Sequence, residues 1–172
     1  MESPSSWGIV VSNAFVFEMK PSEKLRIQTD YLHKVFRPHD LRRTVNSLDL
    51  KIGRLHKKLG FDSIAFTGMS GSAVAYPLSF KSGVPLICVR KGEKRHSVFR
   101  VEGNLSCKNY IIVDDTVSSG DTVRRIIKSI KDNIPNAKCV GVVLYDYHIT
   151  LKQIRVDGQD IPIYCPRLKV KK

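Results

Sequence analysis

The chain has little that would place it in a membrane or cross-link it covalently. No apolar run approaches the length of a bilayer span, and residues 1–6 lack the basic and apolar regions of a secretory signal. The four cysteines, Cys88, Cys107, Cys139 and Cys165, are far apart and include no Cys-x-x-Cys pair, which argues against disulfides and thiolate metal sites. We therefore expect free thiols, no membrane association and a cytoplasmic location.

Acidic residues are scarce relative to basic ones. The 172 residues include 16 Asp and Glu against 29 Lys and Arg, a formal net charge of +13. This sign suits anionic partners, from small phosphorylated molecules to nucleic acids. No basic stripe interleaved with aromatic residues, as in single-strand binders, is visible. A solvated basic surface explains the charge equally simply, so nucleic-acid binding is an alternative that we do not favour.

The length and patterning predict one α/β domain over residues 1–172. The chain is long enough to bury one core, and too short for two large domains. From residue 61 onward, short β-branched runs alternate with helical patterns, which is typical of an open, mainly parallel sheet with helices on both faces. We expect the core over about residues 58–145, and a small cap formed by residues 1–57 and 145–172.

The expected elements can be given in chain order. They are strands within 7–17, helices over 25–36 and 38–59, a strand over 63–66, a turn over 67–72, a helix over 73–82, a strand over 85–89, a charged loop over 90–103, a strand over 110–113, a helix ending near 133 and a strand over 138–144. The helix over 38–59 has an apolar stripe and a basic outer face of Arg42, Arg43, Lys51, Arg54, Lys57 and Lys58. We interpret this face as solvated, with a nucleic-acid surface as the alternative.

The clearest chemical pattern runs from Asn109 to Arg125. An apolar run predicts a buried strand, which two adjacent carboxylates, Asp114 and Asp115, close. A turn of small hydroxyl residues and glycine follows, and then a helical pattern begins. Free N–H groups at a helix start suit a phosphate, and paired carboxylates suit sugar hydroxyls or a divalent cation. A ribose 5-phosphate meets both requirements, whereas an ordinary strand followed by a capped helix is the alternative.

Residues 111–122, Ile-Ile-Val-Asp-Asp-Thr-Val-Ser-Ser-Gly-Asp-Thr, resemble the phosphoribosyl pyrophosphate (PRPP) signature of the type I phosphoribosyltransferases. The resemblance implies that Asp114 and Asp115 hold the ribose hydroxyls. It implies a 5-phosphate cradle formed by Thr116, Val117, Ser118, Ser119, Gly120, Asp121 and Thr122. It also implies a Mg²⁺ cofactor near Asp114 and Asp115, bound mostly through substrate oxygens and water.

A second glycine-containing turn is similar to the pyrophosphate-binding loop of the same family. It comprises Thr67, Gly68, Met69, Ser70 and Gly71, between a strand and a helix. The resemblance implies a non-proline cis peptide within residues 67–70. Tight packing of the helix on its strand is the alternative explanation of the two glycines.

Residues 90–97 form a third candidate segment, rich in basic side chains. Cations closing over a leaving pyrophosphate would stabilise its charge and exclude water, whereas the alternative is a charged surface loop. Arg90, Lys91, Lys94 and His96 match in register the Arg-Lys-x-x-Lys-Asp-His-Gly loop of orotate phosphoribosyltransferases, although Arg95 and Ser97 replace its aspartate and glycine. The resemblance implies that Lys94 and His96 reach the partner subunit's site, hence a homodimer.

The resemblance as a whole implies transfer of 5-phosphoribose from PRPP to a nucleobase with release of pyrophosphate. Its implied catalytic residues are Lys94, His96, Asp114 and Asp115. The base is undecided between orotate and a purine, and Tyr145, Tyr147 and Tyr164 are candidates to stack on it or to pack in the core. The alternative function is a regulator that senses PRPP or binds nucleic acid on the same fold, with little or no turnover.

Overall fold

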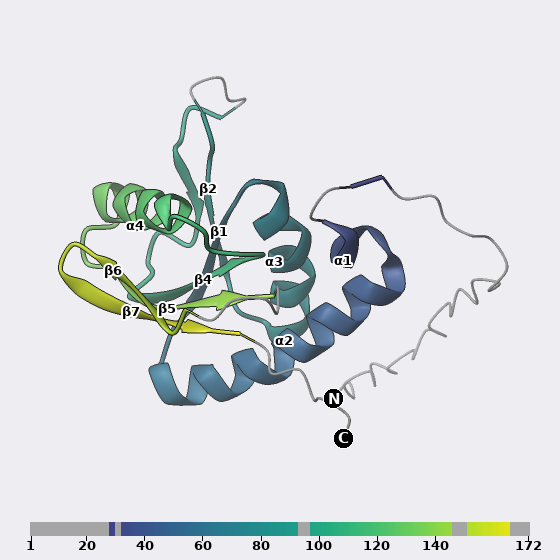
Figure 1. The fold of residues 1–172 in the computed structure, drawn as a ribbon. Coiled ribbons are helices and arrows are strands. Elements are labelled where there is room, and N and C mark those ends of the chain that lie inside the picture. Colours follow the sequence, from purple (N-terminus) through teal and green to yellow (C-terminus); the bar gives the residue numbers. More distant parts are fainter. Residues whose placement is uncertain (1–27, 30–31, 93–96, 146–150, 166–172) are drawn as a thin grey trace, which may run out of the picture.

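A computed structural model describes residues 28–29, 32–92, 97–145 and 151–165 (Figure 1). Its helices are α1 (His33–Phe36), α2 (Pro38–Leu59), α3 (Gly68–Ser82) and α4 (Asp121–Asn133). Its strands are β1 (Ser63–Thr67), β2 (Leu86–Val89), β3 (Val101–Gly103), β4 (Asn109–Asp114), β5 (Lys138–Leu144), β6 (Gln153–Val156) and β7 (Gln159–Tyr164). The strands expected within 7–17, and the first part of the helix expected over 25–36, lie outside the described residues.

The strands form one open sheet in the order β3-β2-β1-β4-β5-β7-β6. Strands β2, β1, β4, β5 and β7 run parallel, whereas β3 and β6 pair antiparallel at the two edges. Helices α2 and α3 cover one face of this sheet and α4 covers the other (Figure 1). The predicted fold class, an open and mainly parallel α/β sheet with helices on both faces, is confirmed.

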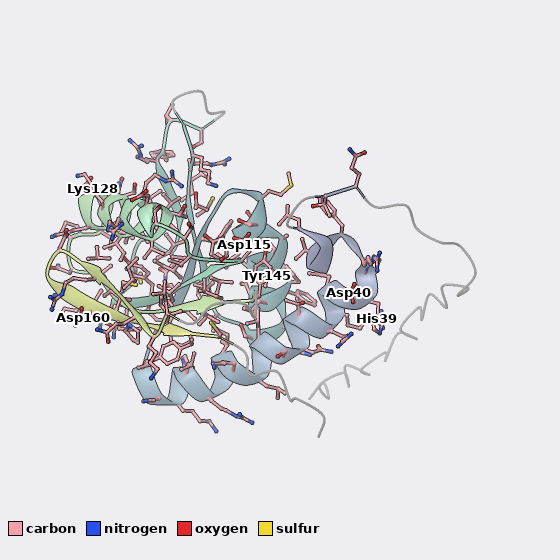
Figure 2. All side chains as sticks on the ribbon, in the orientation of Figure 1. His39, Asp40, Asp115, Lys128, Tyr145 and Asp160 are labelled. Carbon is pink, nitrogen blue, oxygen red and sulfur yellow. The ribbon has the colours of Figure 1, made fainter. Side chains whose placement is uncertain are left out.

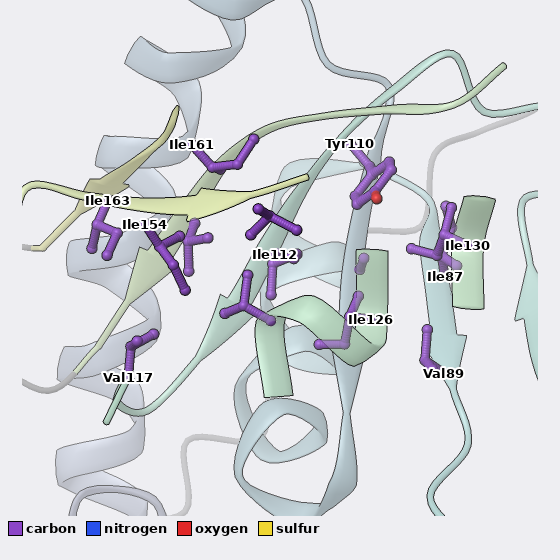
Figure 3. Close-up of a cluster of buried hydrophobic side chains, with 14 of the residues drawn as sticks. Ile87, Val89, Tyr110, Ile112, Val117, Ile126, Ile130, Ile154, Ile161 and Ile163 are labelled. Carbon is purple, nitrogen blue, oxygen red and sulfur yellow. The ribbon is translucent and has the colours of Figure 1, made fainter. Parts of the chain in front are cut away.

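The alternation of side chains along the central strands explains the two buried clusters. In β4, Ile111 and Val113 face α2 and α3, whereas Tyr110 and Ile112 face α4 (Figure 3). Both faces are apolar because helices cover both, as in parallel sheets generally. Figure 3 shows the cluster that faces α4, in which Ile126 of α4 packs together with side chains from β6 and β7. The two clusters hold the carboxyl ends of β1 and β4 in fixed positions.

Three local predictions need correction. The turn expected over 67–72 is helical from Gly68 onward, because Gly71 lets the first turns of α3 approach β4 closely. A Cβ at Gly71 would lie 3.2 Å from the carbonyl oxygen of Val113. No cis peptide bond occurs among the described residues, so the one expected within 67–70 is absent, and Gly68 turns the chain with a φ of 63°. The loop expected over 90–103 includes β3, which pairs with β2.

The described parts of the chain ends belong to the layers of the fold, and the cap expected from residues 1–57 and 145–172 stays a prediction. Helix α2 packs on α3, and β7 extends the sheet beside β5. The missed signal was the alternation of apolar and polar residues in β6 and β7, whose Ile154, Val156, Ile161 and Ile163 are buried. None of the helices in the described ranges is long and apolar enough to cross a bilayer.

Candidate functional site

The candidate site lies where two neighbouring parallel strands end. Strands β1 and β4 pair directly; β1 leads without a break into the first turn of α3 (residues 67–71), and β4 leads through residues 115–120 into α4. Because carboxyl ends of parallel strands meet at one edge of a sheet, these turns come together there. A cavity of about 240 Å³ lies between them. It is lined by Ser70, Lys91, Asp114, Asp115, Thr116, Val117, Ser118, Ser119, Gly120, Asp121, Thr122 and Val123.

A larger cavity of about 500 Å³ lies at the opposite ends of the strands. It is bounded by α2, the end of α3 and the residues before β2, and its polar rim includes Asp49 and Lys81. Lys81 is already paired there, since its Nζ forms an ion pair with Asp49 Oδ2 at 3.8 Å and donates a hydrogen bond to Asn46 Oδ1 at 2.8 Å. Its described lining residues come from α2, the end of α3 and the segments before β1 and β2, and none follows the carboxyl end of a strand, so its size alone does not make it the better candidate.

The carboxylate pair at the end of β4 is held by hydrogen bonds. Asp114 is 4 % exposed, and its Oδ1 accepts from Ser70 Oγ at 2.9 Å and from the backbone N–H of Asp115 at 3.0 Å. Burial first, and then the adjacent Asp115 carboxyl, raise the pKa of Asp114 to about 7, while the Ser70 bond opposes this shift. Asp115 is only half-buried and lines the cavity (labelled in Figure 2). Asp115 is therefore the accessible acceptor, and Asp114 its buried neighbour.

The turn over residues 116–120 leaves its donors available. Among the described residues, the backbone N–H groups of Thr116 to Gly120 have no protein acceptor. The hydroxyls of Thr116 and Ser118 are exposed, whereas Ser119 Oγ donates to Asp121 Oδ2 at 2.6 Å. Together with the free N–H groups of the first turn of α4, this turn offers the donor set that a phosphate needs.

Gly120 is required at the end of this turn for two reasons. Its φ of 82° is a left-handed conformation that side chains disfavour. A Cβ there would also collide with Ile154 Cδ1 of β6, so the β6–β7 hairpin packs directly under the turn. The hairpin therefore shapes the site although it does not line the cavity.

Most side chains of the turn over residues 67–71 do not face the cavity. Thr67 Oγ1 donates to the carbonyl of Val89 at 2.6 Å, and Met69 points outward with 64 % exposure. Of the five predicted residues in this turn, only Ser70 lines the cavity. Gly68 has a different use, because a Cβ there would lie 2.6 Å from Lys91 Nζ. The missing side chain thus lets the Lys91 ammonium cross the turn and reach the cavity.

The described residues of the predicted basic segment differ in whether they line the cavity. Lys91 lines the cavity, whereas Arg90 donates from Nε and Nη2 to Glu102 Oε2 of β3 at 3.1 and 2.7 Å and does not line it. Lys94 and His96 lie outside the described residues. Arg90 is therefore a residue that the sequence assigned to the site and that the structure places in the β2–β3 hairpin.

Tyr145 is a residue whose contribution the sequence did not reveal. It is 1 % exposed, its hydroxyl donates to the carbonyl of Ser70 at 2.9 Å, and its backbone N–H donates to the carbonyl of Asp114 at 3.1 Å. Figure 2 labels it beside α3. Tyr145 thus ties the two turns together and is buried too deeply to stack on a base. Its position directly after β5 was the available signal.

The oxygen donors at the cavity fit a Mg²⁺ ion bound mostly through substrate. No group of three His, Cys, Asp or Glu side chains that could enclose a metal occurs in the described part of the chain. Mg²⁺ usually keeps several waters and takes one or two carboxylates together with substrate phosphates. Asp114 and Asp115 can supply those carboxylates, so the site suits Mg²⁺ arriving with a diphosphate.

Known proteins resemble the chain in sequence over half its length. No protein-family model matches it. It is similar to the orotate phosphoribosyltransferase of Pyrococcus abyssi, with 30 % identity over 90 residues that cover 50 % of this chain and 48 % of that protein. The orotate phosphoribosyltransferase of Methanosarcina acetivorans is 29 % identical over 90 residues, which cover 51 % and 46 %. The chain thus spans about half the length of these curated relatives.

Solved structures resemble it over more of its length. The adenine phosphoribosyltransferase of Saccharomyces cerevisiae superposes with a TM-score of 0.58 at 19 % identity, covering 86 % of this chain and 89 % of that one. The orotate phosphoribosyltransferase of Aeropyrum pernix superposes with a TM-score of 0.56 at 14 % identity, covering 80 % and 76 %. At these identities, the superpositions establish a shared fold.

Proposed function

Because the chain has the type I phosphoribosyltransferase fold, and its relatives support assignment to that family, we propose that it is a PRPP-dependent phosphoribosyltransferase. It would transfer 5-phosphoribose to a ring nitrogen of a nucleobase and release pyrophosphate. One observation carries the proposal: a held carboxylate pair and a turn of free N–H groups line the same cavity. A phosphorylated sugar needs acceptors for its hydroxyls and donors for its phosphate in one cavity.

Different described residues bind different parts of the substrate. Asp115, with Asp114 behind it, accepts hydrogen bonds from the ribose hydroxyls, and residues 116–122 hold the 5-phosphate through backbone N–H groups and hydroxyls. Lys91 and the start of α3 face the diphosphate. Mg²⁺, when bound, would neutralise part of the diphosphate charge.

The chemistry needs little from protein acids and bases. The bond from the anomeric carbon to pyrophosphate breaks while the bond to the base nitrogen forms, so the carbon becomes cationic and the leaving group anionic. Fixed donors and cations stabilise that separation of charge, and positioning supplies the rest. We also propose that Lys94 and His96 contact pyrophosphate in a homodimer. Free cysteines suit the proposed cytoplasmic location.

Calorimetric titration with PRPP and Mg²⁺ tests the site directly. Asp115→Asn should weaken PRPP binding roughly 10- to 150-fold, because charged hydrogen bonds contribute about 1.5–3 kcal/mol. Asp132→Asn, which removes an exposed carboxylate at the far end of α4, is the matched control and should bind as wild type. Equal PRPP affinity in wild type and Asp115→Asn would refute the ribose-binding role.

Turnover separates the enzyme from the regulator. PRPP-dependent pyrophosphate release should be measured with orotate, adenine, guanine, hypoxanthine and uracil, and we expect it with at least one of them. PRPP binding without release for any base would instead favour a PRPP-sensing regulator.

A further inference from the structure

The outer face of α2 carries cations that the protein does not neutralise. Five are exposed: Arg42, Arg43, Arg54, Lys57 and Lys58. None of the five has an ion pair with a described residue. The two acids of the helix are engaged elsewhere, since Asp40 lies 3.7 Å from His39 and Asp49 lies 3.8 Å from Lys81. The face is therefore an uncompensated cationic surface.

Most cations of helix α4, on the opposite face of the sheet, are paired with acidic side chains. Arg124 pairs with Asp121 at 3.2 Å, and Lys128 pairs with Asp132 at 3.1 Å. Lys131 of the same helix lies 3.7 Å from Asp157 in the β6–β7 turn. Three of the four cations of α4 are thus paired, Arg125 being the exception, whereas none of the five exposed cations of α2 has an ion pair with a described residue.

The α2 cations are spaced to follow a linear anion. Arg43, Leu50, Arg54 and Lys57 recur at steps of seven, four and three and so share one side of the helix. At 1.5 Å rise per residue, Arg43 and Lys57 are about 21 Å apart along the axis. Leu50, 67 % exposed, is the sole large apolar side chain within that stripe. A membrane-binding helix needs a broad apolar face, which this stripe lacks.

We propose that the outer face of α2 binds the phosphate backbone of nucleic acid. No α2 residue lines the cavity at the carboxyl edge of the sheet, so this surface is separate from the proposed PRPP site. Binding would be governed by phosphate contacts, since the stripe offers cations and no aromatic side chain to stack on bases. The inference does not depend on phosphoribosyl transfer.

The experiment compares two triple variants of the full chain with equal charge. Arg43→Gln, Arg54→Gln and Lys57→Gln remove the α2 stripe, and Arg125→Gln, Lys128→Gln and Lys131→Gln remove three cations of α4; each set lowers the net charge from +13 to +10. Fluorescence anisotropy should follow binding to a mixed-sequence DNA duplex of about 20 base pairs between roughly 50 and 200 mM salt.

For the α2 variant we expect the slope of log K against log salt to become shallower by about 2.7, which is about 0.9 for each lost phosphate contact. Affinity at about 100 mM salt should fall by two orders of magnitude or more, while the α4 variant should lose less than about threefold. The single variant Lys57→Gln should lower the slope by about 0.9, which keeps the test valid if the triple variant does not fold.

Three results would overturn the proposal. They are equal losses in the α2 and α4 variants, no duplex binding by wild type, and tighter wild-type binding to phosphatidylserine vesicles than to the duplex. Asp115→Asn should bind the duplex as wild type does. Loss of duplex binding in that variant would place nucleic acid in the cavity and contradict a separate surface, whereas loss of PRPP binding alone concerns only the proposed PRPP site.

Discussion

The two turns at the cavity, residues 67–71 and 116–120, have similar compositions and opposite uses. Both join a parallel strand to a helix and contain glycine and hydroxyl residues. In the first turn, Thr67 bonds to β2 and Ser70 bonds to Asp114, so the hydroxyls connect parts of the protein. In the second, the backbone N–H groups have no protein acceptor among the described residues. Similar glycine and hydroxyl residues therefore make internal contacts in the first turn, whereas the second turn leaves its backbone donors open to the cavity.

The difference shows that a strand–turn–helix pattern does not by itself identify a ligand site. What separates the turns is the position of neighbouring groups. Val89 and Asp114 lie within reach of the first turn, whereas the second turn faces the cavity and has the β6–β7 hairpin behind it. We therefore expect substitutions in residues 67–71 to affect stability first, and substitutions in residues 116–120 to affect ligand binding first.

The largest effect is expected from Gly71→Val. A Cβ at Gly71 would lie 3.1 Å from Phe66 Cβ and 3.2 Å from the carbonyl oxygen of Val113, so a larger side chain forces α3 away from the sheet. Overpacking of this kind should lower the free energy of unfolding by about 3 kcal/mol in urea titrations. Gly53→Ala in α2 is the control, since nothing lies within 4 Å of its Cβ, and it should stabilise by about 0.5–1 kcal/mol. A fully stable Gly71→Val protein would mean that α3 does not need this close approach.

The next effect is a dependence of stability on pH that originates at Asp114. Its pKa is raised from 3.8 to about 7 by burial and by Asp115, so the folded state keeps a proton that the unfolded chain has released. The contribution of this carboxyl to stability without ligand should therefore be complete below about pH 4 and be lost as pH rises toward and through about 7. Asp114→Asn should flatten this slope in urea titrations at several pH values.

Asp121→Asn is the control for the pH experiment. Hydrogen bonding from Ser119 and the nearby Arg124 hold the pKa of Asp121 below its usual value, so its contribution is complete above about pH 4 and is lost only under more acidic conditions. The slope between about pH 4 and 7 should survive in this variant. The same slope in Asp114→Asn would assign the proton to another group.

A smaller effect is expected from Ser70→Ala. The variant removes the buried bond to Asp114 and should lower the free energy of unfolding by about 1 kcal/mol. Ser72→Ala on the same helix removes only a bond to the carbonyl of Met69 near the surface and should cost less than about 0.5 kcal/mol. Equal costs in the two variants would show that Ser70 does not link the turns.

The smallest change in stability is expected from Ser118→Ala. Its hydroxyl is exposed and bonds to no described residue, so unfolding should change by less than about 0.3 kcal/mol. PRPP affinity in calorimetry should nevertheless fall about threefold to tenfold, because a hydrogen bond to a charged phosphate is lost. A clear loss of stability with unchanged affinity would reverse the contrast between the two turns.

Local patterns predicted most of the fold. The boundaries of α2 and β5 were predicted as found, because apolar spacing in a long helix and a short apolar run rich in valine are strong signals. The start of α3 was placed five residues too late, since Gly and Ser are weak helix formers and packing on β4 decides there. The β6–β7 hairpin was missed because the two strands are short and their alternating apolar residues are few.

The candidate site was predicted unevenly for a related reason. Residues 114–122 are contiguous, so the sequence placed them together, and all of them line the cavity. Arg90 was assigned to the same site because it matches the basic loop of orotate phosphoribosyltransferases in register, yet it pairs with Glu102 across the β2–β3 hairpin. Sequence neighbours at the end of a strand point in different directions, and which one faces a cavity depends on the partner strand.

The sequence alone determined the alternation of strands and helices and the acidic, donor-rich turn after β4, because both depend on residues that are close together in the chain. Tertiary structure decided the contacts across the cavity: Ser70 with Asp114, 44 residues apart, Lys91 over Gly68, and Tyr145 with both turns. Those contacts depend on the order of strands in the sheet. Strand order minimises exposed apolar surface over the whole chain, and no short segment carries that information.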